Sequence, residues 1–191
     1  MPIVKTKENK TALVNFLQEY GMLAHLPRSG FAFLGTGDQS VADHTCRMLA
    51  IALVLAKLVK EPVDELKLLK LCLFHDLPES RIGDHNYVQK RYVSADMDKV
   101  LKDIHEASPL GPNIVEMIEE FEEQKTLEAR LARDADHLEL LLVLKRELDT
   151  GNPQAADWFE VSQKRLKSPE AQELARQIRA TPYDAWWRGL Q

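Results

Sequence analysis

The chain has 191 residues, of which 45% are hydrophobic, and its 25 basic and 30 acidic residues give a formal net charge of −5. This length and hydrophobic content predict one domain with a sizeable core and argue against a disordered chain. The acidic balance excludes a global basic field that would recruit nucleic acid. A small anionic substrate would therefore need a local positive site, such as a bound metal.

Localisation can be predicted from the N-terminus, the apolar runs and the cysteines. The first ten residues, MPIVKTKENK, are polar and lack the hydrophobic core of a signal peptide. The longest apolar run, residues 48–56, is far shorter than the ~20 residues that span a bilayer. Only Cys46 and Cys72 occur, both in apolar helical contexts, which predicts two reduced, buried thiols. We expect a cytoplasmic protein that does not enter a membrane.

Helical periodicity dominates the chain, and no strand-like alternation persists, so we expect an all-α fold. Ser40 and Asp43 form a capping-box pair at the start of one helix, although Glu or Gln is commoner at the second position. Pro78 disfavours helical geometry at the preceding residue and ends another helix. Segments 27–39 and 79–93 are expected to be loops. In chain order, the expected helices cover approximately residues 8–24, 40–60, 62–75, 94–107, 113–125, 126–148, 154–167 and 169–180.

One expected helix ends in the pair His75–Asp76, on a face that looks buried. An ionised carboxylate there is costly unless a positive charge compensates it. The nearest cation in sequence, Lys70, is not three or four residues away and is therefore no helical neighbour of either side chain. Adjacent helical residues point ~100° apart, but both side chains could reach one ion where Pro78 ends the helix. A divalent metal is one candidate partner.

Further metal ligands are available on two other expected helices. His44 lies in the first turn of its helix on an apolar stripe, and the long helix 126–148 carries Asp134 and Asp136. Asp136 shares a face with apolar residues, whereas Asp134 has Arg130 at i−4 for a simple surface ion pair. Two imidazoles and two carboxylates suit Mn, Fe, Co, Ni or Zn better than Ca, with water at the remaining positions.

The residues alone leave an alternative open. Long gaps between ligands occur by chance, and buried polar groups usually find protein partners. In that interpretation His44 and His75 are ordinary core histidines, and Asp76 caps a helix or forms an ion pair.

The order H…HD…D, carried by His44, His75–Asp76 and Asp136, resembles the signature of HD-domain metal-dependent phosphohydrolases, and the 5′-deoxynucleotidase-like subgroup most closely. The likeness covers nearly the whole chain in ordered blocks. These blocks are SVADHTCRM, FHDLPESRIGD, IEEFE (118–122), EARLARDAD (128–136) and the late LKREL–DTGN segment.

The resemblance implies an HD-domain helical bundle with a C-terminal helical extension. We expect residues 1–191 to form a single domain with its core at about 38–150, on which the N-terminal and C-terminal helices pack. The resemblance also implies a homodimer and one divalent metal ion, and it favours Asp136 over Asp134 as a ligand. The implied ligands are His44, His75, Asp76 and Asp136.

Substrate-handling residues also follow from the resemblance. The acid three residues after the HD pair and the aspartate of the next Gly-Asp act in catalysis in the family, and here these are Glu79 and Asp84. Arg28 matches the loop arginine that contacts substrate phosphate. Phe31 stands where the family often has tryptophan, and it is the matching candidate for a substrate contact. A second loop arginine is missing, and HNYVQKRY follows Asp84 in place of an apolar residue and proline, which leaves the substrate open.

Several other residues are explained more simply without catalysis. His85 and His105 lie where binuclear HD enzymes place extra ligands, but their spacing favours surface histidines. Lys90 and Arg91 favour a solvated face over phosphate contacts. Aromatic side chains near the C-terminus are expected to pack its helices, with an exposed dimer surface as the alternative. These are Trp158, Phe159, Trp186 and Trp187.

We therefore expect a phosphomonoesterase that acts on (deoxy)nucleoside 5′-monophosphates by metal-activated water. One alternative is a non-catalytic metal- or nucleotide-binding module, which the missing loop arginine favours and the presence of Glu79 and Asp84 disfavours. Another is an HD phosphodiesterase, which the lack of binuclear ligands disfavours. The expected partner is a small phosphate ester, with no nucleic acid and no membrane.

Overall fold

The computed structural model describes residues 7–190, and within this range the regular secondary structure is helical, with one isolated antiparallel bridge between Pro27 and Ser40. The all-α prediction is confirmed. In chain order the helices are α1 (Lys7–Gly21), η1 (Met22–Ala24), α2 (Phe31–Leu34), α3 (Val41–Leu58), α4 (Glu65–Phe74), α5 (Glu79–Ile82), η2 (Gln89–Arg91), α6 (Met97–Ala107), α7 (Gly111–Glu123), α8 (Leu127–Asp149), α9 (Gln154–Gln163), α10 (Pro169–Ala180) and α11 (Ala185–Arg188).

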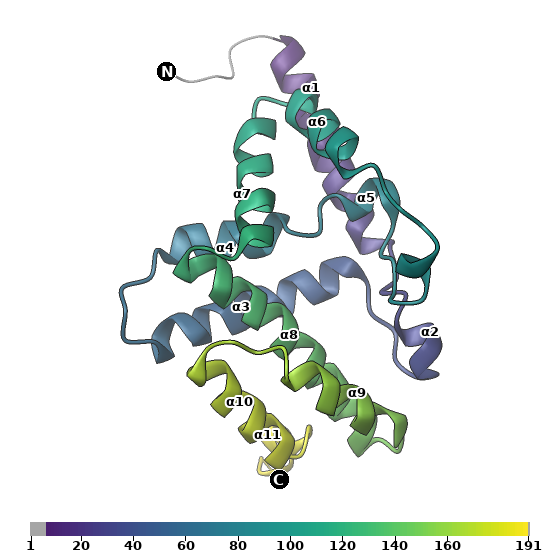
Figure 1. Ribbon diagram of the computed structural model, residues 1–191, viewed down its shortest axis with the longest axis vertical. Coiled ribbons are helices and arrows are strands. Elements are labelled where there is room, and N and C mark those ends of the chain that lie inside the picture. The colour runs from purple at the N-terminus through teal and green to yellow at the C-terminus, as the bar shows by residue number, and fades with distance from the viewer. Residues whose placement is uncertain (1–6, 191) are drawn as a thin grey trace.

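Helix α8 is the central element of the fold. It packs against α3, α4, α7, α9 and α10, and Figure 1 shows it crossing the middle of the molecule. Leu131, Leu138, Leu141 and Leu144 are fully buried along α8 and belong to the main hydrophobic cluster. Any side chain on the middle turns of α8 therefore points into a packed neighbour or a cavity.

A second hydrophobic cluster lies where α1, α6 and α7 meet, at the end of the molecule opposite α10 and α11 (Figure 1). Ile104 and Ile114 are buried there, and the Tyr20 ring packs edge-on against Phe74. Ile118 of this cluster and Phe121 of the main cluster line one large cavity. That cavity therefore lies between the two apolar regions.

Most helix starts follow the local sequence signals. The Ser40 side chain accepts a hydrogen bond from Asp43 N, and the Asp43 carboxylate accepts one from Ser40 N, so the expected capping box is present. Thr126 and Ser168 cap α8 and α10. Helix α4 ends at Phe74, and Pro78 precedes the short helix α5 within a segment expected to be a loop.

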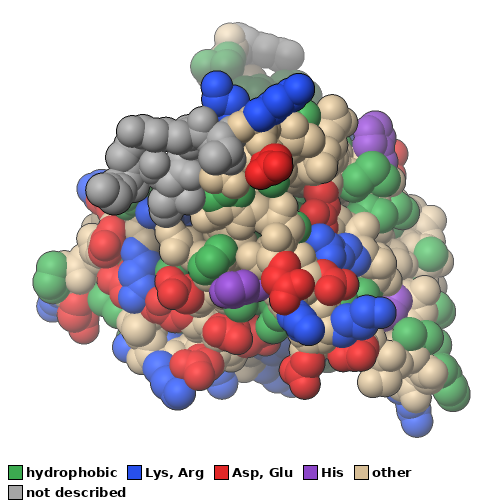
Figure 2. Space-filling view, turned by 90° about the horizontal axis from the view of Figure 1, so that it is seen from above, with side chains coloured by type: hydrophobic (Ala, Val, Ile, Leu, Met, Phe, Trp, Pro, Cys, Tyr) green, Lys and Arg blue, Asp and Glu red, His purple; other side chains and the backbone are tan. Residues whose placement is uncertain are grey.

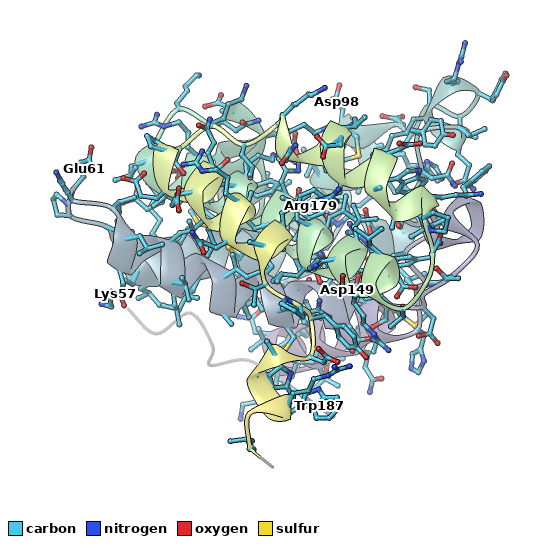
Figure 3. All side chains as sticks on the ribbon, turned by 90° about the horizontal axis from the view of Figure 1, so that it is seen from below. Lys57, Glu61, Asp98, Asp149, Arg179 and Trp187 are labelled. Carbon is cyan, nitrogen blue, oxygen red and sulfur yellow. The ribbon has the colours of Figure 1, made fainter. Side chains whose placement is uncertain are left out.

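The cysteine and tryptophan expectations need correction. Cys72 is buried, but Cys46 is exposed, because it faces outward from α3. Phe159 is fully buried in α9 as expected. Trp186 and Trp187 are 77% and 39% exposed, so neither is buried among the C-terminal helices. Figure 3 shows Trp187 on α11, beyond the main body of the bundle.

Asp134 also differs from the expected surface ion pair with Arg130. It is fully buried, and its two carboxylate oxygens each accept a backbone hydrogen bond at 2.8 Å, from Lys167 N and Ser168 N. These bonds hold the α9–α10 loop, which we define as residues 164–168, against α8. The helix expected over 154–167 accordingly ends at Gln163.

Among the described residues, the face at the α1 and α6 end has no dominant sign of charge (Figure 2). Acidic and basic side chains lie intermixed on the face seen from the α1 and α6 end (Figure 2). Within residues 7–190, no helix combines the length and the hydropathy needed to cross a bilayer.

Asp134→Asn should lower the free energy of unfolding by about 2 kcal/mol or more. An amide offers one acceptor oxygen to two backbone N–H groups and directs its own N–H at the second. Urea denaturation would measure the change, with Asp38→Asn as a control because Asp38 is exposed. The control should stay within about 0.5 kcal/mol of the parent protein. Equal urea midpoints for the two variants would contradict a stabilising role for the two Asp134 hydrogen bonds to the α9–α10 loop.

Candidate metal centre and catalytic cavity

Three helices bring four polar side chains to one point. His44 comes from the first turn of α3, His75 caps the C-terminus of α4, and Asp136 lies in the middle of α8. One ligand atom from each of these three lies within 4.8 Å of the other two. Asp76, in the turn after α4, places its Oδ2 3.0 Å from His75 Nε2 and 3.7 Å from His44 Nε2. The residues predicted to be ligands are therefore close together.

Both imidazoles are oriented by their Nδ1 atoms. His44 Nδ1 lies 2.7 Å from Glu139 Oε2, and His75 Nδ1 lies 2.8 Å from Cys72 O. A carbonyl only accepts hydrogen bonds, so His75 Nδ1 carries a proton. In a neutral ring the lone pair then belongs to Nε2, and the Nε2 atoms of both rings face the carboxylates of Asp76 and Asp136.

The electrostatics of this cluster favour a cation. Burial raises the pKa of Asp76, but His75, then His44 and Arg28, lower it to about 2. Burial also opposes ionisation of Asp136, yet the same histidines and arginine hold its pKa well below the usual value. Both carboxylates therefore stay ionised in a buried place.

The protonation of His44 reflects the same excess of negative charge. Burial, and then the positive charge of Arg28, lower the pKa of His44, but Asp136 and Glu139 outweigh both and raise it to about 9. The site attracts one positive charge to an imidazole that is itself fully buried.

A divalent metal ion fits this donor set. His44 Nε2 and His75 Nε2 are buried atoms without a hydrogen-bond partner in residues 7–190. Neutral imidazole nitrogens together with carboxylate oxygens are ligands that transition metals and zinc accept. A bound cation would satisfy both nitrogens and neutralise Asp76 and Asp136.

Arg28 and Asp84 form the opposite wall of the site. Arg28 Nη1 lies 3.4 Å from Asp76 Oδ2, and its Nε lies 3.9 Å from Asp84 Oδ2. Asp84 also accepts a 2.8 Å hydrogen bond from Ser29 N, which ties the loop of Arg28 to the segment after α5. Burial lowers the pKa of Arg28, but the surrounding carboxylates, Asp76 first, outweigh burial and raise it, so the guanidinium remains charged.

Glu79 is a cavity acid with a raised pKa. It begins α5, and its Oε2 is buried without a hydrogen-bond partner in the described chain. Burial, followed by repulsion from Asp76 and Asp84, raises the pKa of Glu79 to about 8. A carboxyl group with that pKa can hold or release a proton near neutral pH.

These groups line one cavity of about 760 Å³. Arg28, Asp76, Glu79, Asp84 and Asp136 all lie on its wall, together with His75. The volume falls within the range of small-molecule sites.

Phe31 was predicted to contact substrate, whereas surface positions were favoured for His85, His105, Lys90 and Arg91. Phe31 lines a separate depression on the far side of Arg28, not the cavity itself. His85 and Lys90 do line the cavity, whereas His105 and Arg91 are exposed and lie outside it.

Two supporting residues were missed in the sequence. Glu139 is fully buried, receives a 2.7 Å hydrogen bond from Gln39 Nε2, and orients His44. Its position three residues after Asp136, one helical turn along α8, is the signal that could have found it. The Phe121 ring centroid lies 4.7 Å from that of His75. The Arg133 guanidinium carbon lies 4.1 Å from the same Phe121 centroid.

The fold and site define an all-α protein with a buried two-histidine, two-aspartate cluster suited to one divalent cation. The HD-domain family profile matches residues 20–179. The chain therefore belongs to the HD-domain family of metal-dependent phosphohydrolases.

Individual relatives agree with this assignment. The chain is 25% identical to the Homo sapiens protein 5′-deoxynucleotidase HDDC2 over 177 residues, covering 88% of this chain and 85% of that protein. The Dictyostelium discoideum protein of the same name is 31% identical over 140 residues, covering 68% and 74%. The solved structure of a conserved hypothetical protein from Pyrococcus furiosus is 28% identical, with a TM-score of 0.74 and coverage of 88% and 99%. The resemblance predicted from the sequence is confirmed.

Glu139→Gln should weaken metal binding by about tenfold or more, because the neutral amide holds and polarises His44 less well than a carboxylate. Competition with a chromophoric chelator for Zn or Mn would measure the affinity without relying on activity. Glu128→Gln is a matched control, since Glu128 lies in the first turn of the same helix, away from the cavity. Equal affinities for both variants and the parent protein would contradict this role of Glu139.

Proposed function

We propose that the protein is a phosphomonoesterase that hydrolyses (deoxy)nucleoside 5′-monophosphates. The observation that carries the proposal is that two unpartnered imidazole nitrogens, ionised carboxylates and a half-buried arginine lie together at one cavity. The names of the relatives as 5′-deoxynucleotidases support the substrate class. In the proposed reaction a water oxygen bonds to phosphorus and the P–O5′ bond breaks. Its electron pair stays on O5′, and O5′ gains a proton.

The proposed ligands of the metal ion are His44, His75, Asp76 and Asp136. A bound divalent cation supplies positive charge for the phosphoryl oxygens and lowers the pKa of a coordinated water. The His44–Glu139 and His75–Cys72 hydrogen bonds keep the ring nitrogens directed at the site before any ligand arrives.

Arg28 is proposed to bind the phosphoryl group. Its guanidinium is held at the cavity wall between Asp76 and Asp84, and its planar donors match phosphate oxygens. Asp84 keeps the Arg28 loop in place through Ser29 N, and it is the second acid available for proton transfer.

Glu79 is proposed to move the proton. Its buried Oε2 has no hydrogen-bond partner among residues 7–190, so it is free to bond to a water or to the departing oxygen. A carboxyl group that protonates near neutral pH can take a proton from water and return it to O5′.

The two alternatives fit these observations less well. A module that only binds nucleotide or metal has no need for an unpartnered acid with a displaced pKa at the cavity wall. A binuclear phosphodiesterase needs more ligands, and the described residues offer one cluster of three or more ligand side chains, from His44, His75 and Asp136. Homodimer assembly, the single-domain limits and a cytoplasmic location remain predictions.

Glu79→Gln should reduce kcat by about 10²–10⁴-fold, because it removes the acid–base group, while the metal content stays unchanged. Phosphate release from deoxynucleoside monophosphates with Mn or Co, alongside elemental analysis, would measure both quantities. Glu116→Gln, an exposed α7 position outside the cavity, is the matched control. Parental turnover in Glu79→Gln would contradict the role of Glu79. No phosphate release by metal-loaded parent protein over a broad panel of esters would contradict the function.

Arg28→Lys should lower kcat/KM by about tenfold or more, chiefly through KM. Lysine keeps the charge but loses the planar pair of donors that fits a phosphate group. Steady-state kinetics on a deoxynucleoside 5′-monophosphate would measure the effect, with Arg81→Lys as the control because Arg81 binds Glu19 outside the cavity. An unchanged KM would contradict phosphate binding by Arg28.

A further inference from the structure

The catalytic cavity continues past Asp136 into a positively charged recess. Arg133, His137 and Arg165 line the catalytic cavity and also a neighbouring recess of about 420 Å³. Arg133 Nη1 lies 3.6 Å and His137 Nδ1 3.9 Å from Asp136 Oδ2, so the recess begins beside the metal cluster. We call it the basic recess, and its lining residues are Gln124, Arg133, His137, Lys164, Arg165 and Lys167.

The position of the basic recess is fixed by the fold. Arg133 and His137 are one helical turn apart on α8 and therefore share a side of that helix. The opposite wall is the α9–α10 loop, whose backbone is held by the two hydrogen bonds from Lys167 N and Ser168 N to the buried carboxylate of Asp134. This clamp brings Lys164, Arg165 and Lys167 to the basic recess, and Arg165 also reaches the catalytic cavity.

The charges of the basic recess are only partly compensated. Within residues 7–190, Lys164, Arg165 and Lys167 have no carboxylate within ion-pair distance, whereas Arg133 pairs with Glu122 and Asp136. Glu122 is an exposed residue at the cavity rim.

Arg133 is itself prepared for an anion. Its guanidinium lies over the Phe121 ring, and its Nε is buried without a hydrogen-bond partner in the described chain. An arginine that is stacked in place and keeps an unused donor loses little conformational entropy on binding an anion. Although the protein has a net charge of −5, basic side chains gather beside its acidic catalytic cluster.

We propose that the basic recess binds a second phosphate group of the substrate, so that the preferred substrate is a phosphomonoester carrying another phosphate away from the reacting one. The inference deepens the proposed function and rests on it, because the reacting phosphate is placed at Arg28. Lysine and arginine side chains recognise a phosphate dianion by charge and by N–H donors. The P–O5′ bond breaks as in the proposed reaction. The second phosphate stays attached to the alcohol product.

The test compares two probes that differ by one phosphate, deoxyadenosine 5′-monophosphate and deoxyadenosine 3′,5′-bisphosphate. For metal-loaded full-length protein, kcat/KM should be higher for the bisphosphate. Lys164→Ala/Arg165→Ala should reduce the ratio of the two kcat/KM values by about tenfold or more, because each lost charged hydrogen bond has an effect of that order. Lys60→Ala/Arg146→Ala makes the same change in net charge at exposed positions away from the cavity and should leave the ratio unchanged.

Calorimetric binding of both probes separates failure of this inference from failure of the proposed function. Hydrolysis of both probes with a ratio of one or less, or an equal loss on both in Lys164→Ala/Arg165→Ala, would overturn the second-phosphate site and leave the phosphomonoesterase intact. Tighter binding of the bisphosphate that the double variant abolishes, without hydrolysis of either probe, would support the recess and overturn the proposed activity. Absence of both hydrolysis and preferential binding would overturn both.

Discussion

The structure depends on a buried excess of negative charge at the junction of α3, α4 and α8. Asp76 and Asp136 stay ionised there, and burying an uncompensated ion costs several kcal/mol. A domain whose total stability is about 5–15 kcal/mol cannot carry two such charges without compensation. Arg28 supplies part of the positive charge, and Asp136 and Glu139 also raise the pKa of His44, so the cluster favours a further positive charge. A divalent ion held between the imidazoles would supply the missing positive charge.

Helix α8 distributes polar side chains in several directions from a core element. At about 100° per residue, Asp134 and Asp136 leave α8 on nearly opposite sides. Asp136 faces the catalytic cavity, Asp134 faces the α9–α10 loop, and Glu139 reaches back to His44 on α3. The three carboxylates point in different directions and therefore make three separate contacts within two turns of α8. The same helix thereby fixes the metal cluster and the position of the loop beside it.

The sequence predicted helix boundaries that depend on local signals. The capping box at Ser40 and the end of α4 before Pro78 are local patterns, and the helices they mark are present. The ligand set came from the ordered resemblance, because helical spacing alone left Asp134 and Asp136 both open. Asp134 was misplaced because its partners lie 33 and 34 residues away in a loop, where helical spacing carries no information. Trp186 and Trp187 were misplaced for a related reason, since residue type predicts burial only when an element packs over it. The sequence could not predict that the cations of the α9–α10 loop lie beside α8, because the Asp134 hydrogen bonds that place the loop are long-range.

Charge in the cavity also constrains how a phosphate ester can enter it. Asp76, Asp84 and Asp136 surround the position facing Arg28, and the ionised carboxylates of Asp76 and Asp136 repel a phosphate dianion there. Surface charges of mixed sign add little attraction beyond the ~8–10 Å over which salt screens them. Positive charge must therefore act at contact distance, from Arg28 and a metal ion held at the ligand cluster on one side and from the cations beside Arg133 on the other. An ester with one phosphate uses only the first of these, whereas a substrate with two separated phosphates uses both and avoids the acidic centre except at the reacting group.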